Sequence, residues 1–542
     1  MREHIVDIRS PGLADETATL VDKLVAERVA SALAAGDHTL WGRQAEQEAA
    51  CRLAWVTLPE TSRPLLATIE ALRADLHSDG IDRVVLAGMG GSSLAPEVIC
   101  ATSGQGHGPS PLTVLDTTDP GQVADALAGD LTRTVLVVSS KSGSTVETDS
   151  HRRVFAAAFA AAGLDPAAHL VVVTDPGSSL HRLAEAQGYR AVITADPNVG
   201  GRYSALTAFG LVPAGLAGAD IAGLLDDAAE QAPLLSADDP ANPGLRLGAA
   251  LGAAHAAGAD KVVLADTGSG IVGFGDWAEQ LLAESTGKNG VGLLPVVVEG
   301  PGAAGFSDAQ ADATRIAIGP GIDSADIAVT GTLGGQFLLW EHATAVAGRL
   351  LGINPFDQPD VEAAKIAARS LLEDTAGPEP EPALVDGDVA VYPVRNWLSV
   401  DAATLTDALR ALVAATPARG YLAVQAYLDR IADASAAVLR AELARRTWHQ
   451  TTFGWGPRFL HSTGQYHKGG HQNGAFLLLT GEVDEDIPVP DTSFTLGGLQ
   501  RAQARGDAEV LAARGRPVLR LHLLDRAAGM VQVVRAVQEL RP

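Results

Sequence analysis

A run of hydroxyl side chains follows the apolar segment that ends at Val138. It reads Ser139-Ser140-Lys141-Ser142-Gly143-Ser144-Thr145-Val146-Glu147-Thr148. Several O–H donors, together with the N–H groups at the start of a helix, can replace the water around a phosphate monoester. Ser and Thr are also ordinary helix caps, but a cap needs only one hydroxyl. The run therefore predicts a phosphate-binding loop, with helix capping as the alternative.

A glycine-rich turn, Gly88-Met89-Gly90-Gly91-Ser92-Ser93, lies between another apolar run and a helical stretch. Small residues in such a turn let backbone N–H groups approach an anion. The turn lacks the complete dinucleotide fingerprint and the lysine of a P-loop, so a tight turn without a ligand is nearly as good an interpretation. Taken alone, this turn is a weak signal.

Residue type alone does not show which groups transfer protons, and two charged residues illustrate the alternatives. Glu284 ends a helix-compatible run that begins at Trp277, and Arg202 follows two glycines. A carboxylate can act as a general base, and a guanidinium can offset negative charge that develops on a reacting oxygen. A glutamate at a helix end is more often a solvated surface residue, and the arginine could form a structural salt bridge. Residue type alone leaves these alternatives open.

The elements that would hold these residues alternate between short apolar runs and Ala-rich helical stretches. Near-continuous apolar runs are typical of parallel strands that are covered on both faces. Such runs lie at residues 84–87, 135–138, 170–173, 262–265, 295–298 and 327–329. Because the segment 262–268 also echoes 84–90, we predict an α/β fold with two similar, doubly wound parallel sheets.

The remaining segments frame these two halves. Residues 15–80 are helix-compatible, and the proline-rich stretch 376–382 reads as an extended linker. The C-terminal part has strand candidates at 475–479 and 518–521, with helical stretches between 405 and 446. The predicted organisation is a helical N-terminal segment at 1–80, α/β domains at 81–245 and 246–375, and a C-terminal α/β region at 383–542.

Composition excludes several classes of protein. The chain has 542 residues and a net charge of −25, which disfavours nucleic acid or an anionic membrane as a partner. Two cysteines, Cys51 and Cys100, do not make a disulfide framework and fit a reducing compartment. The first residues lack the apolar core of a secretory signal, and no run reaches the length of a spanning helix. We expect a cytoplasmic protein.

Taken together, the motifs resemble those of the phosphoglucose isomerase family. The glycine turn and the hydroxyl run resemble the paired signature of sugar isomerase (SIS) domains. Three further motifs narrow the resemblance: Asn198-Val-Gly-Gly-Arg-Tyr-Ser204, Glu284-Ser-Thr-Gly-Lys288 and Asn354-Pro-Phe-Asp-Gln-Pro-Asp-Val-Glu-Ala-Ala-Lys365. The resemblance implies two SIS domains in a homodimer that interconverts glucose 6-phosphate and fructose 6-phosphate through an enediol. It implies neither a metal nor any other cofactor.

The resemblance also assigns roles to individual residues. Glu284 would move the proton between C1 and C2, Arg202 would offset the charge of the enediolate, and Lys365 would lie near the ring oxygen. Glu147 and Gln358 would shape the sugar pocket. The other residues implied to bind the substrate and its phosphate are Gly91, Ser92, Ser140, Lys141, Ser142 and Thr145.

One family motif is out of its usual order. The ring-opening histidine normally lies between the catalytic glutamate and the Asp-Gln-Pro motif, where this chain has Thr332-Leu-Gly-Gly-Gln336. Phe459-Leu-His461-Ser-Thr-Gly-Gln-Tyr-His467 is similar to the family's His-Ser-x-Gly-Gln-Tyr segment. We therefore predict that the segment has been relocated and that His461 assists ring opening. A metal site made by His461, His467 and His471 is the alternative.

Rival functions make different demands on these residues. A non-catalytic sugar-phosphate sensor would need the phosphate loop but not Glu284, Arg202 or Lys365. A bifunctional phosphoglucose/phosphomannose isomerase would carry the same motifs. A nucleotide-binding dehydrogenase explains only the glycine turn. The C-terminal region also resembles the isomerase half of fused transaldolase–phosphoglucose isomerase proteins, but nothing of transaldolase length precedes the motifs, so we expect a single activity.

Overall fold

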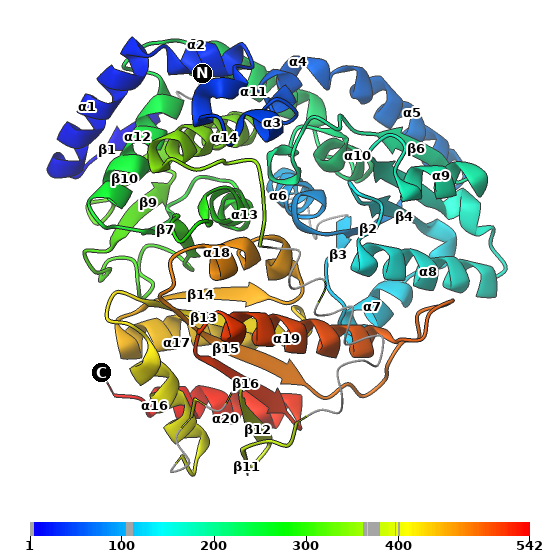
Figure 1. The fold of residues 1–542 in the computed structure, drawn as a ribbon. Helices are drawn as coiled ribbons and strands as arrows, with labels where there is room; N and C mark the ends of the chain where they lie inside the picture. Colours follow the sequence, from blue (N-terminus) through cyan, green and yellow to red (C-terminus); the bar gives the residue numbers. More distant parts are fainter. Residues whose placement is uncertain are drawn as a thin grey trace.

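Three β-sheets organise the chain (Figure 1). The computed structural model describes residues 5–104, 112–360, 366, 380–395, 397–398 and 402–541. The first sheet is wholly parallel, in the order β3-β2-β4-β5-β6. Its strands are β2 (Arg83–Gly88), β3 (Leu112–Leu115), β4 (Thr134–Ser139), β5 (Leu170–Thr174) and β6 (Ala191–Thr194). Its helices are α6 (Leu94–Ser103), α7 (Pro120–Leu127), α8 (Val146–Ala161) and α9 (Ser179–Ala186).

The second sheet has the order β1-β10-β9-β7-β8 and is parallel except for β1, which pairs antiparallel with β10. Its strands are β1 (Ile5–Ile8), β7 (Lys261–Asp266), β8 (Leu294–Val297), β9 (Ala313–Ile318) and β10 (Ile327–Thr330). The helices between and after these strands are α10 (Ala208–Leu216), α11 (Ile221–Leu235), α12 (Pro243–Ala256), α13 (Phe274–Thr286) and α14 (Leu333–Leu351).

The N-terminal segment is helical after its first strand. The helices are α1 (Pro11–Ala26), α2 (Val29–Ala34), α3 (Glu46–Ala49), α4 (Leu58–Thr61) and α5 (Pro64–Ser78). The strand β1 was not predicted, because four residues on a sheet edge are too few to show a clear alternation.

The third sheet lies in the C-terminal region and has the order β11-β12-β16-β15-β13-β14. The strands are β11 (Leu384–Asp386), β12 (Val389–Pro393), β13 (Tyr421–Tyr427), β14 (Gln450–Trp455), β15 (Gly474–Gly481) and β16 (Val518–Leu523). The helices are α16 (Leu405–Ala415), α17 (Val438–Thr447), α18 (Gly464–Gly469), α19 (Leu496–Ala513) and α20 (Arg526–Gln538).

Each apolar run singled out in the sequence coincides with a strand, although the run 295–298 extends one residue past β8. The predicted α/β class is confirmed, with one wholly parallel sheet and one that is parallel except for β1. The helices α16 and α17 confirm the helical stretches predicted between residues 405 and 446, but the strand β13 that lies between them was not predicted. Every residue of β13 is buried, and a fully buried strand in an Ala- and Leu-rich sequence cannot be told from a helix by periodicity.

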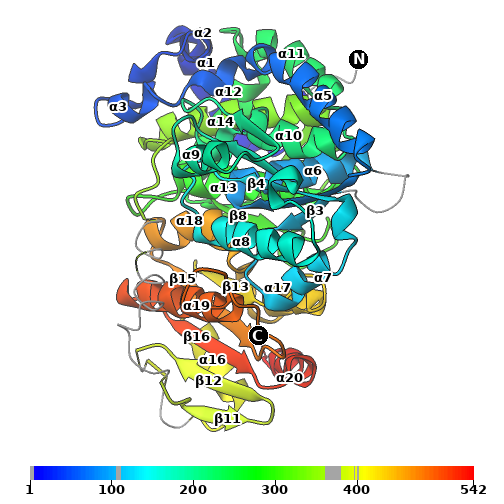
Figure 2. The same cartoon turned by 90° about the vertical axis from the view of Figure 1, so that its right-hand side faces the viewer.

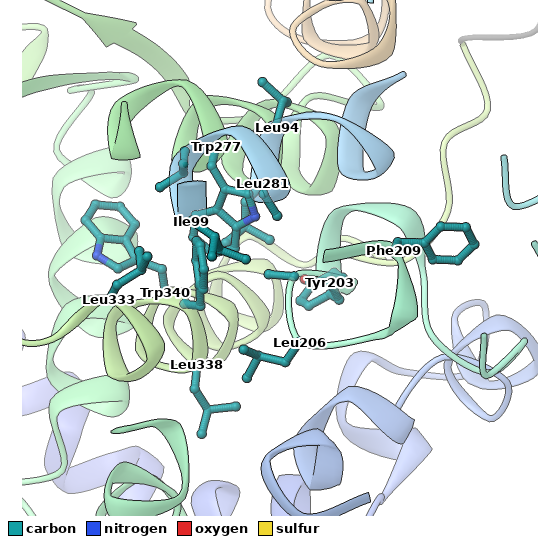
Figure 3. Close-up of a cluster of buried hydrophobic side chains, with 14 of the residues drawn as sticks. Leu94, Ile99, Tyr203, Leu206, Phe209, Trp277, Leu281, Leu333, Leu338 and Trp340 are labelled. Carbon is teal, nitrogen blue, oxygen red and sulfur yellow. The ribbon is translucent and has the colours of Figure 1, made fainter. Parts of the chain in front are cut away.

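One apolar core joins the first two sheets. Figure 3 shows part of it, where α6, α10, α13 and α14 meet. Trp277 and Leu281 of α13 are buried there beside Trp340 of α14, whose indole N–H donates to Gln336 Oε1 at 3.0 Å. This packing holds α13, the helix that carries Glu284, in a fixed position.

The third sheet packs beneath the other two, as Figure 2 shows from the side. Phe476 and Leu478 of β15 share an apolar cluster with Val263 of β7, so the third sheet covers the outer face of the second. Leu496 of α19 joins a separate cluster with Phe155 of α8. The C-terminal region therefore contacts both preceding units, the first being the first sheet with its helices and the second being the second sheet with its helices. Among the described residues, no helix is long and apolar enough to cross a membrane.

Candidate active site

The glycine turn and the hydroxyl run adjoin at one edge of the first sheet. Gly88, the last residue of β2, pairs with Ser139, the last residue of β4. Because the two strands are parallel, the loops that follow them leave the sheet on the same side, where ligands of open α/β sheets bind. The glycine turn and the hydroxyl run thus converge on one place.

The hydroxyl run forms a loop before α8 whose own side-chain hydroxyls lie within hydrogen-bond distance of one another. Ser140 Oγ lies 3.0 Å from Thr145 Oγ1, and Ser142 Oγ lies 3.0 Å from Ser144 Oγ. Thr145 occupies the N-cap position of α8, yet its hydroxyl makes no capping hydrogen bond to any part of the chain that the structure describes. Capping therefore does not account for this hydroxyl, and the positive end of the α8 dipole lies directly behind the loop.

Lys141 ties the loop to the neighbouring strand. Its Nζ donates to Asp175 Oδ2 at 2.7 Å and to the carbonyl of Pro197 at 3.2 Å. Burial raises the pKa of Asp175 and the Lys141 ammonium only partly offsets this rise. The ammonium therefore stabilises the loop conformation and adds positive charge beside it.

Gly91 and the buried Ser92 pack against the loop that carries Arg202. A Cβ atom on Gly91 would lie 1.9 Å from the carbonyl oxygen of Gly201, closer than any real contact. Only glycine at position 91 allows the two backbones to meet in this way.

Arg202 and Glu284 form a buried pair. Arg202 Nε lies 3.3 Å from Glu284 Oε2, and their side chains are 4% and 8% exposed. The guanidinium also donates to the carbonyl of Glu284 at 3.0 Å and to Gln358 Oε1 at 3.1 Å. It donates further to the carbonyls of Pro355 and Asp357, each at 3.1 Å. Arg202 therefore connects the glutamate motif to the Asp-Gln-Pro motif.

Lys288 holds the Asp-Gln-Pro loop from the other side. Its buried Nζ donates to Asp357 Oδ1 and to the carbonyl of Asn354, both at 2.7 Å. Burial and the nearby Arg202 lower the pKa of Lys288 to about 8, and Asp357 opposes this shift.

Gln280, which the sequence interpretation missed, bridges two parts of the site. Its Nε2 donates to Glu284 Oε2 at 3.1 Å and to the backbone carbonyl of His461 at 2.9 Å. It lies one helical turn before Glu284, and residues four apart share a helix face. That spacing could have identified Gln280 once Glu284 was chosen.

His461 reaches Glu147 within the same chain. Its Nε2 lies 3.1 Å from Glu147 Oε1, across 314 positions of sequence. Because an ionised carboxylate can only accept, Nε2 carries a proton and Nδ1 is left to exchange one. Burial alone would raise the pKa of Glu147, but His461 and further hydrogen bonds outweigh it, and the pKa lies below its ordinary value.

The segment that follows His461 docks onto both isomerase motifs. Gln465 Nε2 donates to the carbonyl of Gly287 and to Asp360 Oδ2, each at 2.9 Å, and its Oε1 accepts from the N–H of Asp360 at 3.0 Å. The packing is close, because a Cβ on Gly287 would lie 2.4 Å from Tyr466 Cα. A segment distant in sequence thus adjoins the motifs of Glu284 and Gln358.

The other two histidines of that segment point elsewhere. His467 Nδ1 lies 3.0 Å from the hydroxyl of Tyr421, and His471 Nε2 lies 3.4 Å from His255 Nε2. Within the described ranges, no group of three or more His, Cys, Asp and Glu residues could hold a metal ion. Lys365 lies outside the described residues.

A buried charge network anchors the turn η8 (Arg458–His461). Arg458 lies 2.6 Å from Glu97 Oε2 and 3.0 Å from Asp116 Oδ2, and Arg430 lies 2.7 Å from Glu97 Oε1. Burial by itself would raise the pKa of Glu97, but Arg458 and then Arg430 lower it to about 2. These two arginines of the C-terminal region therefore form ion pairs with α6, a helix of the first sheet's domain.

This network should make stability depend on pH. A carboxyl group with a lowered folded-state pKa contributes stability above its unfolded pKa, and the contribution is lost as pH falls through the folded value. We expect Glu97→Gln to lower the free energy of unfolding by about 3 kcal/mol at pH 7. The deficit should shrink as pH falls from 4.5 toward 2.

Urea denaturation at pH 7 and pH 3 checks this expectation. The matched control is Glu60→Gln, which removes an exposed pair with Arg63 and should leave the free energy of unfolding almost unchanged at both pH values. An equal deficit for Glu97→Gln at both pH values would contradict the assignment.

Comparisons with known proteins agree on one family. The family model described as phosphoglucose isomerase matches residues 72–231. The glucose-6-phosphate isomerase of Thermosynechococcus vestitus is 31% identical over 381 residues, which cover 57% of this chain and 71% of that protein. The enzyme of the same name from Acaryochloris marina is 29% identical over 382 residues, covering 58% of this chain and 72% of that protein.

A solved structure shares the fold. The glucose-6-phosphate isomerase of Chlamydia trachomatis superposes with a TM-score of 0.51 at 20% identity, covering 67% of this chain and 84% of that one.

Proposed function

The chain belongs to the phosphoglucose isomerase family, and on this premise we propose that the site around Glu284 interconverts D-glucose 6-phosphate and D-fructose 6-phosphate. The observation that carries the proposal is a buried carboxylate, Glu284, linked through the amide of Gln280 to the segment of His461. A sugar-phosphate sensor would have no use for such a base. We further propose that the protein works in the cytoplasm as a homodimer.

We assign phosphate binding to the loop that the hydroxyl run forms. Ser140, Ser142 and Thr145 would donate to the phosphate oxygens, with Ser92 and the backbone of Gly91 at the adjoining turn. The α8 dipole and the Lys141 ammonium add positive potential in a strongly acidic protein. The sugar would then extend from this loop toward Glu147 and Glu284.

Ring opening falls to His461. In the cyclic aldose its protonated Nδ1 would donate to the ring oxygen as the bond between C1 and that oxygen breaks, while the C1 hydroxyl releases its proton to solvent and becomes the carbonyl. Glu147 accepts from Nε2, which orients the imidazole so that Nδ1 can face the substrate. We propose that Lys365 assists near the ring oxygen.

Isomerisation falls to Glu284. In the open-chain aldose its carboxylate would take the proton from C2 and return it to C1, while the C2 hydroxyl loses its proton and the C1 oxygen gains one, so that the carbonyl moves from C1 to C2. Negative charge develops on the substrate oxygens in between, and Arg202, whose Nε lies 3.3 Å from Glu284 Oε2, would offset it. Each nitrogen of the guanidinium already contacts a protein oxygen, so Arg202 would act through its charge and by placing Glu284 and Gln358.

A coupled assay tests the function. Purified protein is given fructose 6-phosphate, and glucose-6-phosphate dehydrogenase with NADP reports the product. Turnover is the expected result, and mannose 6-phosphate with its own coupling enzyme separates a bifunctional isomerase from a specific one. Saturable binding of fructose 6-phosphate without turnover would contradict the proposal and favour a sensor.

Thr145→Val tests the phosphate loop. We expect the KM for fructose 6-phosphate to rise about 10-fold with kcat little changed, because a hydrogen bond to a charged phosphate is lost from ground state and transition state alike. Stability should hold, since this hydroxyl does not cap α8 in the described structure. Thr61→Val, in the N-terminal helices, is the control. An unchanged KM would remove Thr145 from the phosphate site.

A further inference from the structure

We propose that Gln503, on helix α19 of the C-terminal region, is a positioning residue that holds Glu147 in place for His461. The inference rests on the proposed function and deepens it. It adds to the ring-opening pair a third member that none of the sequence motifs contains.

The contact is short and buried. Gln503 Nε2 donates to Glu147 Oε1 at 2.6 Å, and the same oxygen accepts from His461 Nε2 at 3.1 Å. Gln503 and Glu147 are each 3% exposed. Water therefore cannot replace the amide easily, and loss of the amide would leave the carboxylate short of a donor.

The direction of the amide is determined by its two neighbours. The Glu147 carboxylate only accepts, so the amide must turn its NH₂ group toward it. The amide oxygen then faces Thr118, whose hydroxyl donates to Gln503 Oε1 at 3.0 Å. Thr118 is fully buried on the loop after β3. The row of hydrogen bonds from Thr118 through Gln503 and Glu147 to His461 can thus form with only one orientation of the Gln503 amide.

A neutral donor suits this position. An arginine or lysine in place of Gln503 would neutralise the carboxylate that His461 needs when its imidazole becomes charged. An amide offers a hydrogen bond without a full charge, so the negative charge of Glu147 remains available to His461. Gln503 therefore fixes geometry and leaves the electrostatics to Glu147.

Both partners of Glu147 come from the C-terminal region, whereas Glu147 lies on α8 of the first unit. Figures 1 and 2 show α19 beneath α8, and Leu496 of α19 packs in one apolar cluster with Phe155 of α8. The interface between the two units thereby sets the position of the ring-opening pair.

A double-mutant cycle tests the proposal on the full chain. We expect Gln503→Leu to lower kcat/KM for fructose 6-phosphate by about 10- to 100-fold, the loss expected for one hydrogen bond to a charged group. In the His461→Ala background the same change should cost less than about twofold, because the group it positions is gone.

Gln500→Leu is the matched control. Gln500 lies on the same helix, is equally buried at 3%, and its amide lies 3.4 Å from Asp119 Oδ2 instead of Glu147. We expect Gln500→Leu to retain activity within about threefold. Equal losses for the two leucine variants would mean that α19 acts only as a scaffold, which would overturn the proposal.

A pH profile gives a readout that a purely structural residue would not move. In Gln503→Glu the new carboxyl group can donate to Glu147 only while it is protonated. The activity of Gln503→Glu should therefore approach that of the unmodified protein at low pH and fall as pH rises. Over the same pH range the activity of Gln503→Leu should be lower by a constant factor, so that its pH profile has the shape of the unmodified protein's.

The outcomes separate the two claims. If His461→Ala keeps full activity, the proposed ring-opening role is wrong and the role of Gln503 falls with it. If His461→Ala is impaired but Gln503→Leu is fully active, or equally damaging with and without His461, only the inference about Gln503 is wrong.

Discussion

Replacing Glu284 with glutamine is expected to lower kcat for fructose 6-phosphate by about a thousand-fold. Glutamine has the shape of glutamate and can still accept from Arg202 and Gln280, but its amide cannot take a proton from carbon. The binding of substrate should change little, because the proposed phosphate contacts lie on the loop before α8. The loss should therefore appear in kcat, while KM stays within a few-fold.

The helix itself offers a control for this experiment. Glu279 is the neighbour of Gln280 on α13, and burial and then Asp276 raise its pKa well above the ordinary value. Glu279→Gln replaces a carboxyl group of the same helix whose pKa is raised, so exchange for a neutral amide is a mild change there, and activity should be retained. If Glu284→Gln kept more than about a tenth of the activity, another group would have to be the base.

Gly91→Ala is expected to lower kcat/KM by at least about 100-fold and to destabilise the protein by about 1–3 kcal/mol. The new methyl group would lie 1.9 Å from the carbonyl oxygen of Gly201 and 2.7 Å from its carbon. Backbone atoms cannot move aside as a flexible side chain can. The loop would have to retreat and carry Arg202 away from Glu284.

Gly201→Ala is the reciprocal control. A Cβ on Gly201 would meet no atom of the described residues within 4 Å, so this variant should fold and turn over nearly as the unmodified protein does. Steady-state kinetics and urea denaturation of both variants provide the measurement. Equal behaviour of the two variants would show that the contact between the turn and the Arg202 loop is not needed for activity.

Much of the fold could be predicted because its signals are local. The apolar runs that became β2, β4 and β5 are continuous, as strands covered on both faces require, and the turns that end them contain Gly or Ser. The short β1 and the buried β13 were missed. In both, the strand state is decided by pairing with residues far away in the chain, and a few residues of sequence do not encode that pairing.

The phosphate chemistry of the hydroxyl run could be read from its own residue types, since it follows from side chains a few positions apart. Glu284 was singled out only because its motif resembles one of the phosphoglucose isomerase family. The sequence by itself determined the fold class, the family resemblance and a set of candidate groups. Only the tertiary structure decided that His461 meets Glu147 across 314 positions and that Gln503 meets it across 356. Those contacts depend on how the C-terminal region packs on the first unit, and sequence spacing carries no measure of that packing.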